Sequence, residues 1–159
     1  MKSRTLAIWI LALGGLFLNA CAPTQAKRVN PVEQAGLRDT VKIDVMEFNI
    51  RDAESEPYIH RMTITDPQML DELLDALDTN LQVTLKLACI PEYELHFHLR
   101  DGTVQTFGYS CHGASFIRGE QGFWAGEDYA PPEQFDALIK EQLALNPREL
   151  IPASIKQSW

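Results

Sequence analysis

The stretch YELHFHLRDGTVQTFGYSC, residues 93–111, decides the fold. Apolar and polar residues alternate on both sides of Asp101-Gly102, which indicates two half-buried strands joined by a tight turn. We expect a three-residue loop, Arg100 to Gly102, with the glycine in the left-handed conformation. This loop pairs Leu99 with Thr103, Phe97 with Gln105, Leu95 with Phe107 and Tyr93 with Tyr109. Such a register places the aromatic and branched side chains on one face, so the hairpin belongs to an antiparallel sheet with one apolar face.

The segments that flank this hairpin predict further strands and two helices. Period-two alternation predicts strands over residues 41–50, 58–64 and 81–87, with a bulge near Met46 or Glu47, and a second hairpin over 115–125. Helical spacing of apolar residues follows Asp66-Pro67 and again Pro131-Pro132. These residues are Leu70, Leu73, Leu74 and Leu77 in the first helix and Phe135, Leu138, Ile139 and Leu143 in the second. We therefore predict an α+β fold, an antiparallel meander sheet of about five or six strands with two helices packed on one face.

The N-terminal 21 residues indicate export from the cytoplasm. A short basic start, with Lys2 and Arg4, precedes an apolar run over residues 6–18. The run is shorter than the roughly 20 residues that a membrane-spanning helix needs, so it is typical of a secretion signal. We expect residues 1–20 to be the signal peptide, residues 21–40 to be a flexible tether and residues 41–159 to form a single globular domain.

The end of this signal, Leu18-Asn19-Ala20-Cys21, resembles the lipobox of bacterial lipoproteins. The resemblance implies that Cys21 is diacylated, as with palmitate, and becomes the mature N-terminus, so that the lipid bilayer is a partner of the chain. The implied location is the cell membrane on its extracytoplasmic side. In a host with two membranes, Ala22 resembles the pattern that sorts lipoproteins to the periplasmic side of the outer membrane. The alternative is an ordinary signal peptide cleaved near Ala20 or Ala22.

The charge of the chain argues against nucleic acid as a partner. The formal net charge is −8, and removal of Lys2 and Arg4 with the signal peptide takes it to −10. Nucleic-acid phosphates require a basic surface. The same acidity disfavours adhesion to anionic lipid other than through an acyl anchor.

The cysteines predict one disulfide bond. With Cys21 assigned to lipid, Cys89 and Cys111 remain as a pair in an oxidising compartment. The hairpin register places them one diagonal step apart on one face. The competing interpretation is a catalytic thiol in Cys111-His112, but adjacent residues on a strand point to opposite faces, so the imidazole would not reach the sulfur.

Two histidines of the central hairpin suggest a metal site. His96 and His98 lie two apart on a strand and therefore share the face opposite the core, where neutral imidazoles could bind zinc. His60 on the second predicted strand, if that strand lies beside this one, or Glu94 would be the third ligand. The alternative is that these side chains are ordinary polar positions on the open face of a one-sided sheet, in which case no cofactor is expected.

An aromatic, glycine-containing loop suggests a recognition surface. Phe123, Trp124 and Tyr129 could hold an envelope protein, a peptide or a glycan, although they could equally complete the core. The nearby acidic residues Glu120, Glu127 and Asp128 show no spacing typical of catalytic carboxylates or of a calcium loop. Because no catalytic motif is present, we expect a non-enzymatic binding or assembly module of the cell envelope. The alternative is a metal-dependent protein that uses His96 and His98.

Overall fold

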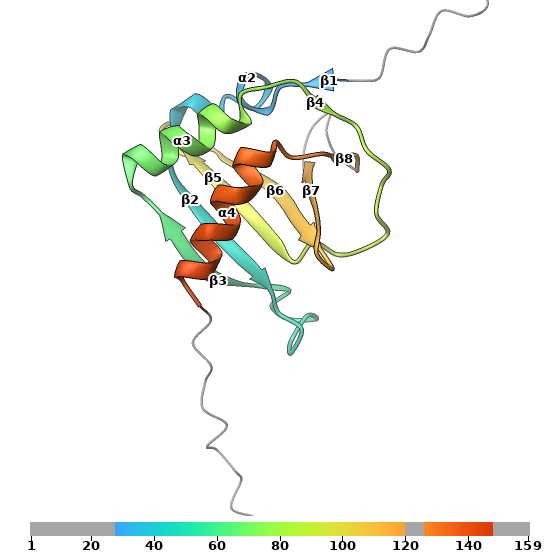
Figure 1. The fold of residues 1–159 in the computed structure, drawn as a ribbon. Coiled ribbons are helices and arrows are strands. Elements are labelled where there is room, and N and C mark those ends of the chain that lie inside the picture. The colour runs from blue at the N-terminus through green and yellow to red at the C-terminus, as the bar shows by residue number, and fades with distance from the viewer. Residues whose placement is uncertain (1–27, 120–125, 148–159) are drawn as a thin grey trace, which may run out of the picture.

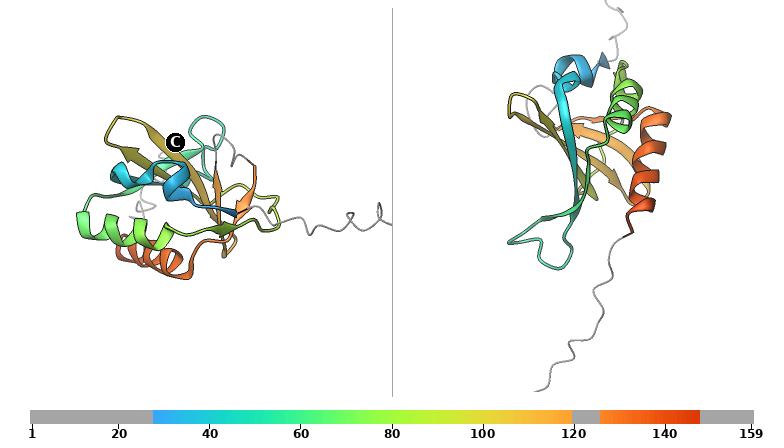
Figure 2. Two further views of the ribbon diagram at one scale, coloured as in Figure 1. Left: turned by 90° about the horizontal axis from the view of Figure 1, so that it is seen from above. Right: turned by 90° about the vertical axis from the view of Figure 1, so that its left-hand side faces the viewer.

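The computed structural model describes residues 28–119 and 126–147, which form an α+β domain (Figure 1). Its main sheet has six antiparallel strands in the order β3-β2-β5-β6-β7-β8. The strands are β2 (Thr40–Phe48), β3 (Tyr58–Ile64), β5 (Tyr93–Leu99), β6 (Val104–Cys111), β7 (Ala114–Gly119) and β8 (Asp128–Tyr129). Helices α3 (Pro67–Leu77) and α4 (Glu133–Leu145) lie side by side over one face of the sheet (Figure 2). The predicted fold class is confirmed.

The central hairpin has the predicted register. Leu95 pairs with Phe107 and Tyr93 with Tyr109, and the N–H of Leu99 donates to the carbonyl of Thr103 at 2.8 Å. Gly102 has φ 88°, a conformation that glycine adopts without steric cost, so it completes the three-residue turn. Side chains of this hairpin that face the helices are buried, which fixes the position of the core.

A β-bulge in β3 reverses the alternation of its side chains between the two faces of the sheet. Val45 of β2 pairs with Met62, whereas Met46 pairs with His60, so Arg61 is an extra residue with no opposite partner. The irregularity occurs where the sequence predicted it, but the inserted residue is on β3 and not on β2. Because of this insertion, His60 and Thr63 lie on the same open face, although a spacing of three would put them on opposite faces of a regular strand.

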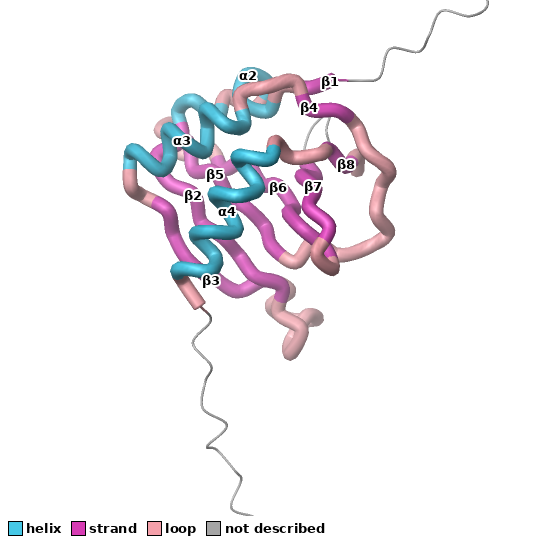
Figure 3. The backbone as a smooth tube through the Cα atoms, in the orientation of Figure 1, coloured by secondary structure: helices cyan, strands magenta, loops and turns pink. Residues whose placement is uncertain are grey.

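The path of the chain is a meander only from β5 onward. β3 and β5 both flank β2, so the connection between them, which includes α3, crosses over β2. The predicted strand over residues 81–87 is reduced to β4 (Leu81–Gln82), which pairs with β1 (Arg28–Val29). Beyond Val83, which bridges Tyr129, the chain turns away as a loop (Figure 3). This loop continues to Glu92 and borders the site described below.

The two helices pack through the apolar faces that the sequence predicts. Asp66 caps α3 by accepting from the N–H of Met69, Pro67 occupies the first turn, and all four leucines of the pattern are buried. Phe135 and Ile139 of α4 are fully buried. Tyr109 donates its hydroxyl to Asp136 at 2.5 Å, and burial together with this carboxylate raises the pKa of Tyr109, so the hydroxyl remains a donor that ties α4 to the sheet.

The prediction of a flexible tether as far as residue 40 is wrong from residue 28 onward. Residues 31–39 form the short helix α2 (Pro31–Gln34) and the 3₁₀ turn η1 (Leu37–Asp39), and their apolar side chains enter the core. The Asn30 side chain caps α2 and also donates to Asp78 of the segment after α3 at 2.7 Å. Arg38 forms ion pairs with Asp75 and Asp78. The N-terminal segment therefore packs against α3 through polar contacts distant in sequence.

The described residues form one core. Their buried apolar side chains lie between Val29 and Ile139. Of the helices that these residues form, none is long and apolar enough to cross a membrane. The predicted signal peptide, Cys21, Phe123 and Trp124 lie outside the described residues.

Candidate functional site

The predicted disulfide bond between Cys89 and Cys111 is present. The two Cα atoms are 6.5 Å apart, within the range that a disulfide bridges. Cys111 ends β6 and pairs with Ala114 across a tight turn in which His112 and Gly113 both have positive φ. His112 is therefore an exposed turn residue beside a bridged cysteine. This arrangement excludes the thiol and imidazole pair of the competing interpretation.

A buried ion pair holds the loop of residues 83–92 against the sheet. Asp128 is fully buried, and its carboxylate accepts from Arg118 Nε at 2.6 Å and from the Leu87 N–H at 2.7 Å. The Arg118 guanidinium also donates to the carbonyls of Leu87 at 2.7 Å and Cys89 at 2.9 Å. Three hydrogen bonds to the backbone of the loop thus surround the pair, as a desolvated pair requires. The ion pair and the disulfide bond together fix one loop.

This loop forms one wall of a hollow of about 590 Å³ at the end of the sheet, which we call the disulfide hollow. Its volume is in the range of pockets that hold small ligands or side chains. The other walls come from the end of β2, the start of β5 and the turn after β6. Its principal lining residues are Phe48, Ile50, Cys89, Ile90, Glu92 and Cys111.

The walls of the disulfide hollow are held together by hydrogen bonds between segments that are distant in the sequence. Tyr58 donates its hydroxyl to the carbonyl of Pro91 at 3.0 Å, and the N–H of Phe48 donates to the carbonyl of Glu92 at 2.8 Å. The rings of Phe48 and Tyr58 pack edge to face, with centroids 5.7 Å apart. The hollow is therefore formed before any ligand arrives.

Glu92 presents a carboxylate at the hollow. Its oxygens accept from the Ser110 hydroxyl at 3.0 Å and from the His112 N–H at 2.9 Å. Both donors are uncharged. Among the residues that the structure describes, no lysine, arginine or histidine side chain forms an ion pair with Glu92, so its negative charge is oriented but not neutralised.

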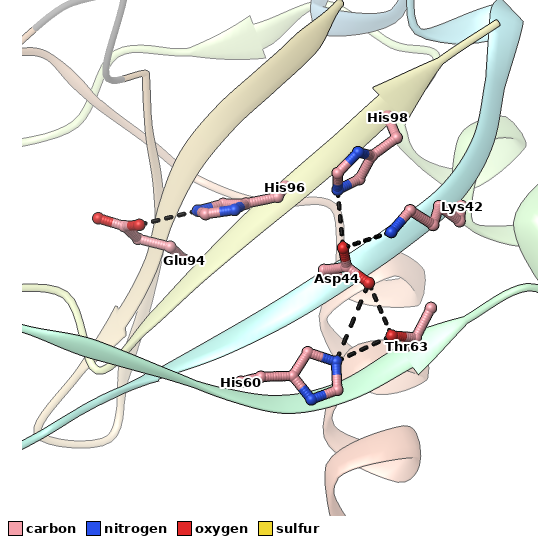
Figure 4. A network of polar contacts seen from close by, with 7 residues as sticks. All are labelled: Lys42, Asp44, His60, Thr63, Glu94, His96 and His98. Carbon is pink, nitrogen blue, oxygen red and sulfur yellow. Dashed lines mark hydrogen bonds and ion pairs between the residues drawn. The ribbon is translucent and has the colours of Figure 1, made fainter. Parts of the chain in front are cut away.

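A second polar cluster occupies the open face of the sheet, where Asp44 of β2 is the central residue (Figure 4). The Asp44 carboxylate accepts from Lys42 at 2.8 Å and from Thr63 at 2.6 Å. The imidazole of His98 lies 2.7 Å and that of His60 lies 4.0 Å from its oxygens. The His98 approach lacks hydrogen-bond geometry, so it is an ion-pair contact when the ring is protonated.

The histidines of this face do not converge on one point. His96 and His98 share the open face as predicted, but His96 contacts Glu94 at 2.9 Å, whereas His98 and His60 both approach Asp44. The Lys42 ammonium group occupies the space that a cation beside Asp44 would need. Within residues 28–119 and 126–147, no group of three or more histidine, cysteine or acidic side chains is placed to hold a metal ion. The zinc hypothesis has no third ligand in this part of the chain.

Asp44→Asn is expected to lower the stability of the domain at neutral pH by about 1 kcal/mol, because the variant loses hydrogen bonds to a charged acceptor. Burial opposes ionisation of Asp44, but the hydrogen bonds from Lys42 and Thr63 outweigh it, so the pKa of Asp44 lies below its ordinary value. A lowered pKa stabilises the folded state above the unfolded value of 3.8, and this contribution is lost as the pH falls through the folded value.

Urea denaturation at pH 7 and at pH 3, followed by circular dichroism, measures this effect. The difference in free energy of unfolding between the unsubstituted protein and Asp44→Asn should be smaller at pH 3 than at pH 7. The exposed Asp71→Asn on α3 is the control and should change little at either pH. An equal loss for Asp44→Asn at both pH values would contradict the role assigned to the charged carboxylate.

The predicted aromatic recognition surface is not formed by Tyr129. This residue is fully buried, and its hydroxyl donates to Glu127 at 2.8 Å, so its ring belongs to the core. Two of the acidic residues nearby stabilise the fold. Asp128 forms the ion pair with Arg118, and Glu127 accepts the hydrogen bond from the Tyr129 hydroxyl. Glu120 lies outside the described residues, as do Phe123 and Trp124.

Sequence reasoning missed the disulfide hollow. Ile50 and Ile90 are 80% and 61% exposed and lie at the hollow. Ile50 comes at the end of the strand predicted over residues 41–50, and Ile90 lies in a segment without any period. An available signal was the position of Ile90, an apolar residue between a bridged cysteine and Pro91, where neither a strand nor a helix would bury it. Large exposed apolar residues around a concave surface are typical of binding sites.

The fold and the hollow define a small α+β domain, braced by one disulfide bond, with a preformed apolar hollow that carries one oriented carboxylate. No protein-family model, curated protein or solved structure matches the chain.

Proposed function

We propose that the chain is a lipid-anchored extracytoplasmic protein whose folded domain binds a partner in the cell envelope and catalyses no reaction. The disulfide hollow carries this proposal, because it combines a rigid wall, exposed isoleucines and an oriented carboxylate. The resemblance of residues 18–21 to a lipobox supports the anchor. The disulfide bond agrees with an oxidising compartment outside the cytoplasm.

The arrangement of the polar groups favours binding over catalysis. The cluster around Asp44 lies on the open sheet, where Lys42 already neutralises the carboxylate, and it does not line the hollow. Within the described residues, the lining of the hollow contains no free thiol and no serine or threonine hydroxyl, one of which nucleophilic catalysis of this kind requires. The Ser110 hydroxyl that donates to Glu92 belongs to a buried residue that does not line the hollow. A module of this kind would hold its partner by shape, apolar contact and charge.

The anchor is tested by expressing the full chain in bacteria that receive labelled palmitate. We expect the label on the chain and the chain in the membrane fraction. Cys21→Ser should lose both, whereas Cys89→Ser, made with Cys111→Ser, should keep the label because these cysteines form the disulfide bond. A chain that is released unlabelled with Cys21 intact would contradict the anchor.

Binding at the hollow is tested in the same cells with a photo-crosslinking amino acid at position 90. Position 85 is the matched control, because Leu85 is also exposed and lies on the same loop but does not line the hollow. We expect a discrete crosslinked species from position 90 that is absent from position 85. Equal, diffuse crosslinking from both positions would count against a binding surface at the hollow.

A further inference from the structure

We propose that the disulfide hollow receives an apolar side chain from a cationic peptide segment of a partner protein, and that Glu92 recognises the positive charge beside that side chain. This inference rests on the proposed function and names the chemistry of the partner. It follows from three properties of the hollow: its exposed apolar rim, its unneutralised carboxylate and its fixed walls.

The apolar part of the proposal comes from Ile50 and Ile90. The first follows β2 and the second lies on the loop before β5, so the two reach the hollow from different segments. Their exposure, 80% and 61%, leaves apolar surface in water beside a concavity already lined by Phe48. An apolar side chain inserted between these walls removes water from both partners, which is the main favourable term in association.

The charge of the partner follows from Glu92. Its carboxylate is oriented by the Ser110 hydroxyl and the His112 N–H, so no reorientation is needed to accept a lysine or arginine donor. The neighbouring connection after β2 adds three acidic side chains, Asp52, Glu54 and Glu56, against a single Arg51. This surface attracts a cationic segment and repels anionic lipid headgroups.

The fixed walls explain why a short segment is sufficient. The disulfide bond and the Tyr58 to Pro91 hydrogen bond hold the loop before binding, so a ligand does not have to order it. Preorganisation of this kind lowers the entropic cost of association. A peptide with alternating lysine and leucine presents the required charge and apolar side chain within a few residues.

The test titrates such a peptide, acetyl-KLKLKL-amide, into the chain from residue 21 onward with Cys21→Ser. This form contains every residue of the core that the structure describes, from Val29 to Ile139. Binding is followed by NMR shifts and calorimetry. Acetyl-ELELEL-amide and acetyl-KSKSKS-amide separate the contribution of charge from that of the leucines. We expect the first peptide to bind at least about tenfold more tightly than either control. The ELELEL peptide loses a charge-assisted contact and the KSKSKS peptide loses the burial of a leucine side chain, and each loss corresponds to about that factor or more.

Two variants localise the binding. Glu92→Gln keeps the shape of the side chain and an acceptor oxygen for the His112 N–H, and its amide can donate to the Ser110 hydroxyl oxygen. This variant should weaken binding about tenfold, whereas Glu133→Gln, at the exposed start of α4, should have no effect. Ile90→Ser should weaken binding about fivefold or more, and Leu85→Ser should not. Because Ile90 is an exposed loop residue, its variant keeps the test valid even if Glu92→Gln unfolds the domain. Denaturation midpoints confirm that each variant is folded.

The outcomes separate this proposal from its rivals. Equal binding of the ELELEL peptide, or binding that ignores Ile90 and Glu92, overturns it. Binding of phosphatidylglycerol vesicles that Ile90→Ser abolishes would make the occupant a lipid. Self-association that the same variant abolishes would make it a second copy of the chain. Palmitate labelling does not depend on these titrations, so an unlabelled Cys21 counts against the anchored module, whereas a failed titration counts against this occupant.

Discussion

Asp128→Ala is expected to lower the free energy of unfolding by about 3–5 kcal/mol, the usual cost of removing one partner from a buried ion pair. The substitution leaves the Arg118 guanidinium, only 13% exposed, without its counter-charge. It also removes the acceptor for the Leu87 N–H. The loop of residues 83–92 therefore loses its side-chain bond to β8 and keeps only backbone bonds such as that from the Thr84 N–H to the Asp128 carbonyl. At the same time the sheet acquires an uncompensated charge. Urea denaturation followed by far-ultraviolet circular dichroism measures the loss.

A surface pair and a double substitution are the controls for this prediction. Arg38→Ala removes the ion pairs to Asp75 and Asp78 at the exposed edge of α3, and it should shift the denaturation midpoint little because exposed pairs contribute little. Arg118→Met combined with Asp128→Leu should recover part of the loss, since apolar replacement of both partners removes the unpaired charge. An effect of Asp128→Ala as small as that of Arg38→Ala would contradict the structural role of the buried pair.

Replacing Cys89 and Cys111 by serine together is expected to cost about 3 kcal/mol, because the bond closes a loop with a sequence separation of 22 and restricts the unfolded chain. Reduction of the unsubstituted chain should give the same denaturation midpoint as the double variant. The loss should also be local, so amide hydrogen exchange should increase over residues 87–92 more than over α3.

The double serine variant also tests how the hollow is held. At a urea concentration where the variant remains folded, its affinity for the KLKLKL peptide should fall, because the loop that carries Ile90 is no longer fixed to β6. Either a midpoint unchanged by reduction or uniform exchange across the domain would show that the bond does not hold this loop. Binding that is unchanged in the folded variant would show that the hollow does not depend on it.

The elements with a long, regular pattern were predictable from the sequence, because the residues that determine each of them lie close together in the chain. The register of the central hairpin depends on alternation and on Gly102, both of which act within a few residues. The helix α3 depends on Asp66, Pro67 and a four-leucine stripe in the same way. The disulfide bond followed from the hairpin register and from the count of cysteines.

The remaining features depend on contacts that no local pattern reveals. The helix α2 has only four residues, and its capping residue Asn30 is bonded to the distant Asp78, so the segment resembles a linker in the sequence. His60 reaches Asp44 because Arg61 is inserted into β3, which a regular period does not predict. The disulfide hollow needs three segments to meet, and its exposed isoleucines break the rule that large apolar residues are buried.

The bulge at Arg61 has a consequence for solubility. β3 is an edge strand of the main sheet, and an extended edge with regular spacing is a template on which another chain can add a strand and begin to aggregate. The inserted residue divides β3 into two short pieces, Tyr58–His60 and Met62–Ile64, so an added strand could not continue its hydrogen bonds in one register. Deleting Arg61 would therefore give a straighter edge and a chain more prone to form intermolecular sheets. Such protection matters most for a protein that an acyl anchor would concentrate on a surface.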